Sequence, residues 1–275
     1  MLPEYRVKAR NTAAGGENGM HDDAVAQKFG FRGALVPGVT VYAYLTHPLV
    51  SEFGTGWLDR GVTNVRFVKP VMEGEEVVVT GEITDRTAQA ITARVAAITA
   101  ASGECATATV TLPAGLPTPV NLVHYASASL PSERPLATKE ALLGMSVLGT
   151  PIALYDDGAA SAYLDRVSDP HAIYRGPGAR NHPAFYLSEA NRALSRNVHM
   201  PAWIHVGSVV RHLAAARIGD TLTTRGRVRS LFEKKGKEFV ELDLVITAGA
   251  PGASGRAIAH VLHTAIYRLP APVAG

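Results

Sequence analysis

The sequence predicts an α+β fold built from two copies of one unit, in each of which an antiparallel sheet wraps a central helix. Two observations predict it. Segments with helical periodicity precede long strands of alternating apolar and polar residues, and several residues recur at a nearly constant offset along the chain. The 275 residues are enough for two domains of ordinary size.

The repeat is carried by tryptophans and glycines. Trp57 and Gly61 recur 146 positions later as Trp203 and Gly207. At an offset of 145, the matches are Val65-Arg66 with Val210-Arg211, Gly74 with Gly219 and Gly81 with Gly226. We therefore expect both copies to turn at the same places and both tryptophans to lie in the core.

In the first copy, a helix is predicted to begin at Pro37-Gly38. Its apolar residues recur at helical spacing, and Pro48 is expected to break or kink it. After the segment 62–69, strands are predicted over residues 76–84, 89–100 and 105–112. Their period-two alternation indicates that one face of the sheet is buried.

The second copy repeats this layout. A strand is predicted near 146–155, a short helix near 158–166, and a helix after Pro183 whose apolar stripe leaves Glu189, Arg192 and Arg196 outside. Alternating residues over 240–246 and 257–267 predict two further strands. The proline-rich stretch between the copies is the predicted linker. The predicted domains are 1–112 and 146–270, with a linker over 113–145.

Composition narrows the class of protein. The formal net charge is +3, without a long run of Lys or Arg, so a nucleic-acid surface is not indicated. The single cysteine, Cys105, cannot form a disulfide within the chain, which fits a reducing compartment. The N-terminus lacks the apolar stretch of a signal peptide, and no segment has the pattern of a membrane span. We expect a cytoplasmic protein.

The most informative stretch is residues 16–38, where Asn18, His21, Ala26, Phe31 and Gly38 stand in order. It resembles the MaoC-like (R)-specific enoyl-thioester hydratase/dehydratase family. The motif of that family is roughly Gly-Asp-x-Asn-Pro-x-His, followed by an Ala, an aromatic residue and Ala-His-Gly. The resemblance covers residues 5–112 well and 146–269 as a degenerate second copy. It implies a double hotdog fold.

The resemblance also implies a reaction, the hydration of a 2-enoyl thioester or the dehydration of a 3-hydroxyacyl thioester. The thioester is carried by coenzyme A or a carrier protein, and no other cofactor is implied. Glu17 and His21 would share the acid–base work, Asn18 would hold the loop, and the Gly38 N–H would bind the thioester carbonyl.

The sequence departs from the family motif in two places. The family aspartate is missing, and Glu17 replaces it only if one residue is deleted. Val36-Pro37-Gly38 stands where the family has Ala-His-Gly. The second copy has His182 at the latter position, but we find no Asp…His motif upstream of it. We therefore expect the site in the first copy.

Two other functions remain open. A hotdog thioesterase would need only a carboxylate and water at the same helix N-terminus, and a protein with a dead site would bind an acyl thioester without reaction. Asp22 and Asp23 are expected to cap and begin the helix over 24–29.

We expect no metal site, because His260 and His263 would point to opposite faces of a strand, and His199, His205 and His212 form no evident ligand set. The expected partner is an acyl-CoA or acyl-carrier thioester, with no nucleic acid or membrane. A monomer is feasible because the two copies can join their sheets internally, although a homodimer is favoured.

Overall fold

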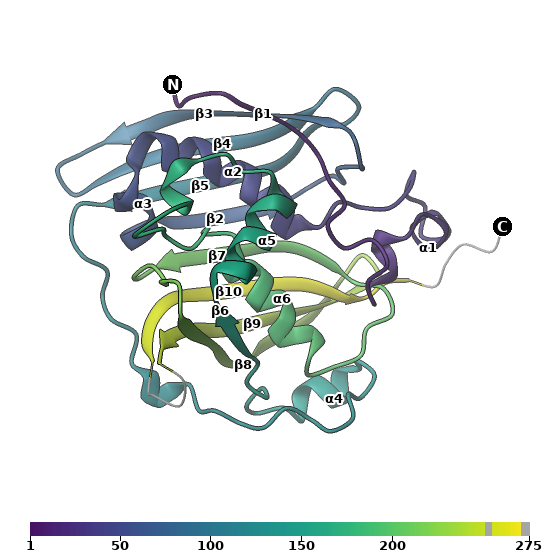
Figure 1. Ribbon diagram of the computed structural model, residues 1–275. Coiled ribbons are helices and arrows are strands. Elements are labelled where there is room, and N and C mark those ends of the chain that lie inside the picture. Colours follow the sequence, from purple (N-terminus) through teal and green to yellow (C-terminus); the bar gives the residue numbers. More distant parts are fainter. Residues whose placement is uncertain (251–254, 271–275) are drawn as a thin grey trace.

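In the computed structural model, which describes residues 1–250 and 255–270, a ten-stranded antiparallel sheet runs through the molecule (Figure 1). The strand order is β1-β3-β4-β5-β2-β7-β10-β9-β8-β6. The helices α2 and α6 lie against one face of it, each over the strands of its own copy. The predicted α+β double hotdog is confirmed in this arrangement.

The first copy contributes five strands and the helix that they curve around. The strands are β1 (Tyr5–Lys8), β2 (Val62–Phe67), β3 (Glu76–Arg86), β4 (Ala90–Thr99) and β5 (Gly103–Pro113). The central helix α2 (Gly38–Phe53) starts where the sequence predicts. The short elements before and after it are η1 (Gly19–His21), α1 (Asp23–Lys28) and α3 (Thr55–Arg60). The Asp22 side chain caps α1 as predicted, accepting from the Val25 N–H at 3.0 Å.

The second copy repeats this order with longer strands. Its strands are β6 (Ile152–Tyr155), β7 (Ile204–His212), β8 (Asp220–Lys234), β9 (Lys237–Gly249) and β10 (Arg256–Arg268). Its helices are α5 (Asp157–Val167), η3 (Ala172–Tyr174) and the central α6 (Phe185–Ser195). The stretch predicted as a linker holds η2 (Leu122–His124) and α4 (Lys139–Leu143). The domain limits themselves stay a prediction.

The internal repeat is visible in the backbone. Gly74 and Gly219 both have positive φ, 80° and 92°, in the turns that lead into β3 and β8. The register of β3 shifts between Ile83 and Asp85, and that of β8 shifts between Val228 and Ser230, 145 positions later. Equivalent turns and bulges at the predicted offset indicate that the two halves are copies of one unit.

The copies join where β2 pairs antiparallel with β7 over five residue pairs, from Val62↔Arg211 to Arg66↔Gly207. The central pair is Asn64 with Val209, which are also equivalent positions of the 145-residue repeat. The pseudo-twofold axis therefore passes between these residues. A Cβ on Gly207 would lie 2.8 Å from the Val65 carbonyl oxygen, so this pairing requires glycine.

The expected break of the helix at Pro48 is wrong, and so is the position of Glu189 outside the apolar stripe. Pro48 does not break α2, which continues to Phe53, because nearly all of the helix from Val39 to Val50 is buried and its packing outweighs the local penalty. Glu189 lies in the buried part of α6, where its carboxylate pairs with Arg192 at 3.3 Å. Both tryptophans are buried as predicted.

Candidate active site

Asn18 fastens the loop before α1 to the second copy. Its Oδ1 accepts hydrogen bonds from the backbone N–H of Met20 at 3.2 Å and of Trp203 at 3.1 Å. Its Nδ2 donates to the Trp203 carbonyl at 3.1 Å. Because backbone donors and acceptors cannot exchange roles, these three bonds fix the orientation of the amide.

His21 is thereby held in one tautomer. Its Nδ1 lies 2.7 Å from the Leu35 carbonyl oxygen, which can only accept, so Nδ1 carries the proton. Its Nε2 lies 3.2 Å from Asn18 Nδ2, which can only donate. Nε2 therefore presents a lone pair. Burial lowers the pKa of His21 below its ordinary 6.5, although the bond to Leu35 opposes this effect.

The N-terminus of α2 forms a second part of the site. Pro37 caps the helix without a side-chain hydrogen bond, and the N–H groups of Gly38 and Val39 have no acceptor among the described residues. These groups and the helix dipole attract negative charge. Gly38 leaves the backbone uncovered here, since a Cβ would lie 3.2 Å from His205 Nδ1 and 3.3 Å from the Phe67 ring.

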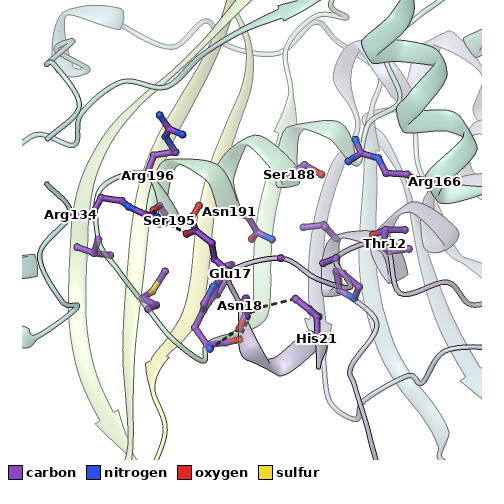
Figure 2. A pocket seen from close by; sticks show the side chains of 18 of the residues that line it. Thr12, Glu17, Asn18, His21, Arg134, Arg166, Ser188, Asn191, Ser195 and Arg196 are labelled. Carbon is purple, nitrogen blue, oxygen red and sulfur yellow. Dashed lines mark hydrogen bonds and ion pairs between the residues drawn. The ribbon is translucent and has the colours of Figure 1, made fainter. Parts of the chain in front are cut away.

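Two cavities meet at these residues. One, of about 200 Å³, is largely apolar and reaches Gly38 and His205. The other, of about 590 Å³, is more polar and includes Arg134, Arg166 and Arg196. Figure 2 shows His21, Asn18 and Asn191 within the larger cavity. The residues that line both are Asn18, His21, Pro37, Asn191 and Trp203. A ligand that passes His21 can therefore extend into both spaces.

Of the four predicted site residues, the structure brings Asn18, His21 and Gly38 together on the smaller cavity. The fourth, Glu17, directs its carboxylate away from them. Its exposed carboxylate makes a bidentate ion pair with Arg134 of the linker, at 2.7 and 3.2 Å (Figure 2). This hydrogen bonding lowers the pKa of Glu17. Among the described residues, no hydrogen bond links Glu17 to His21, whereas Asn18 contacts His21 directly. The expected acid–base partnership of Glu17 with His21 stays a prediction that this geometry does not support.

His205 is a site residue that the sequence did not indicate. It is buried on β7, lines the smaller cavity with His21, and packs its ring against Phe67. Its proximity to Gly38 comes from the pairing of β2 with β7, which joins segments far apart in the chain. The alternation of residues along the strand could indicate that His205 faces inward. No pattern in the neighbouring sequence indicates that it reaches the first copy.

The second copy holds its own buried polar cluster. Asp169 accepts from His47 of α2 at 2.9 Å and from His182 at 3.2 Å. Burial alone would raise the pKa of Asp169, but these hydrogen bonds outweigh it and hold the pKa well below its ordinary value. The cluster lines neither cavity, so we assign it to the packing of α2 on the second copy.

Within the described ranges 1–250 and 255–270, no group of three or more His, Cys, Asp or Glu side chains is arranged to hold a metal ion. In the same ranges, no helix combines the length and apolar character that crossing a bilayer requires.

Comparison with known proteins supports the family resemblance that the sequence predicts. Residues 12–103 match the family described as MaoC like domain, which confirms the resemblance predicted for this stretch. No curated protein matches the chain in sequence.

Solved structures similar to the chain share its fold over nearly their whole length. A candidate MaoC domain protein dehydratase from Chloroflexus aurantiacus is 12% identical, with a TM-score of 0.64 and coverage of 98% of this chain and 96% of that one. RV0216 from Mycobacterium tuberculosis, described as having a double hotdog fold, is 17% identical, with a TM-score of 0.60 and coverage of 96% of each chain. A candidate thioesterase from Novosphingobium aromaticivorans is 14% identical, with a TM-score of 0.55 and coverage of 97% and 96%. At such identities the likeness establishes the double hotdog fold.

Proposed function

Because residues 12–103 form a MaoC-like domain within a double hotdog, we propose that the protein is a hydro-lyase. Its substrates are 2-enoyl or 3-hydroxyacyl thioesters of coenzyme A or of a carrier protein. The observation that carries the proposal is His21, which presents an Nε2 lone pair in a cavity that also reaches the N-terminus of α2. This reaction requires a base that takes a proton from water and N–H groups that stabilise the negative charge on the thioester oxygen, and both line this cavity.

In the hydration direction, His21 Nε2 takes a proton from water while the water oxygen bonds to C3 of the enoyl group. The electron pair of the double bond moves toward the thioester carbonyl, and the resulting enolate oxygen faces the N–H groups at the start of α2. His21 then returns the same proton to C2, so one water is added in total. Dehydration follows these steps in reverse.

Asn18 holds the base in position. Its contact with His21 Nε2, at 3.2 Å, is long enough that a water hydrogen can compete for the lone pair. The three backbone bonds of Asn18 keep the amide in place while this exchange occurs. Glu17 would act as a further acid or base only after its ion pair with Arg134 opened, so we propose that its role is to hold the loop against the linker.

The test is incubation with crotonyl-CoA. We expect the enoyl absorbance to fall without release of free thiol, and His21→Ala to lower kcat/KM by about 100-fold or more because the base is lost. The exposed His124→Ala is the matched control and should retain the wild-type rate.

Release of free thiol in place of loss of the double bond would show that the protein is a thioesterase. A wild-type protein that binds the thioester unchanged would show that the site is dead. Either result would overturn the hydro-lyase proposal.

A further inference from the structure

Behind the N-terminus of α2 lies a chain of three buried polar side chains from β7 and β10. His205 Nε2 is 2.9 Å from Ser208 Oγ, and Ser208 Oγ is 3.1 Å from His263 Nδ1. His205 is 6% exposed, Ser208 3% and His263 0%. The chain belongs to the second copy but ends at the cavity beside Gly38.

The cavity end of this chain is an unused polar atom. His205 Nδ1 is buried and has no hydrogen-bond partner among the described residues. Such an atom destabilises the folded protein. Because His205 lines a cavity, its unmatched atom is accounted for if a bound ligand supplies the partner.

Gly38 brings this atom close to the start of α2. A Cβ on Gly38 would lie 3.2 Å from His205 Nδ1, which is a tight contact, so a glycine at this position lets the imidazole approach the helix backbone. At this end of α2, the N–H groups of Gly38 and Val39 have no acceptor among the described residues. An oxygen atom of a ligand in the cavity that Gly38 and His205 both line would have both kinds of donor beside it.

The protonation state of His205 decides whether its Nδ1 can donate a hydrogen bond to a ligand. Burial, and to a smaller extent the nearby His263, lowers the pKa of His205 well below its ordinary 6.5, so the ring is neutral and has one N–H. When Ser208 donates to His205 Nε2 and accepts from His263 Nδ1, this N–H is on Nδ1. A carbonyl oxygen can only accept, so its binding selects this arrangement.

We propose, on the basis of the proposed function, that His205 Nδ1–H is a second donor to the thioester carbonyl oxygen and stabilises the enolate together with the N-terminus of α2. No bond to His205 forms or breaks. Ser208 and His263 are positioning residues that keep the proton on Nδ1. Both copies therefore contribute to the site: the first supplies the base, His21, and the second supplies a hydrogen-bond donor, His205.

The first measurement is the infrared carbonyl stretch of bound butyryl-CoA, a saturated thioester that cannot be hydrated. A hydrogen bond to the carbonyl lowers this frequency. We expect part of the lowering to disappear in His205→Phe and to return in His205→Asn, whose amide N–H can occupy the place of Nδ1–H. Ser208→Ala should weaken it, because His205 Nε2 loses its partner. His212→Phe is the matched control, a buried histidine of the same strand that lines neither cavity.

The second measurement is turnover of crotonyl-CoA. His205→Phe should lower kcat by about 100-fold, with KM within a few-fold of wild type, as for loss of one oxyanion donor. Gly38→Ala tests the same contact independently, since its methyl group would lie 3.2 Å from His205 Nδ1 and would force the imidazole away from the start of α2. It decides the question if His205→Phe does not fold.

The outcomes separate this proposal from the hydro-lyase proposal. If the wild type hydrates crotonyl-CoA but His205→Phe retains both the carbonyl shift and kcat, the role of His205 is overturned and the function stands. If the wild type does not hydrate but shows a shift that His205→Phe loses, the role of His205 stands and the function is overturned. A wild type that does not bind butyryl-CoA overturns both.

Discussion

At the scale of single residues, the tautomer of His21 governs the chemistry of the site. Leu35 and Asn18 leave a lone pair on Nε2, and burial lowers the pKa of the ring below 6.5. The unprotonated form is the active base, and a lowered pKa extends it to lower pH. We therefore expect kcat/KM for crotonyl-CoA to fall on the acid side with a midpoint below pH 6.5. A midpoint at or above that value would contradict the assigned role.

The residue scale also shows what the sequence could reveal about the site. Asn18, His21 and Gly38 were predicted because they lie in one short motif, and they line one cavity. His205 was missed because it reaches Gly38 only through the pairing of β2 with β7. Arg134 was also missed, because its ion pair with Glu17 joins the linker to the first copy, and the two residues lie far apart in the chain. Local patterns hold no information about such long-range contacts.

At the scale of elements, the seam between β2 and β7 depends on Gly207. In Gly207→Ala, the added methyl group would lie 2.8 Å from the Val65 carbonyl oxygen, which is closer than normal contact. The two strands must then separate. We expect the free energy of unfolding to fall by about 1–3 kcal/mol, measured by urea denaturation.

Gly115→Ala is the control for this variant, because a Cβ there would meet no atom within 4 Å. Equal stability of the two variants would show that the seam tolerates a side chain. The elements themselves were predictable, because strand alternation and turn glycines are local signals. The course of α2 through Pro48 was not, because it depends on burial by distant strands.

At the scale of the whole molecule, buried histidines make stability depend on pH. Burial lowers the pKa of His212 and His263 to about 3 and also lowers those of His182 and His205. Below pH 6.5 the unfolded chain binds protons that the folded protein does not, so stability falls as pH falls. We expect His212 and His263, whose pKa is about 3, each to cost about 2 kcal/mol between pH 7 and pH 5.

Urea denaturation at several pH values measures this dependence. In His212→Phe, the free energy of unfolding should change less with pH, because one buried histidine no longer contributes. The hydrogen-bonded carboxylate of Asp169, whose pKa is lowered, adds a further loss once the pH falls below about 4. A free energy of unfolding that is constant between pH 7 and pH 5 would contradict the expectation.

The hydrogen bonds from Asn18 to the backbone of Trp203 have a consequence for the history of the chain. The residue that orients His21 is itself oriented by the other half. A gene encoding the first half alone would yield a chain in which the His21 imidazole lacks this support. The backbone at residue 203 and the loop near residue 18 must therefore keep their relative position for the site to form, although 185 positions separate them.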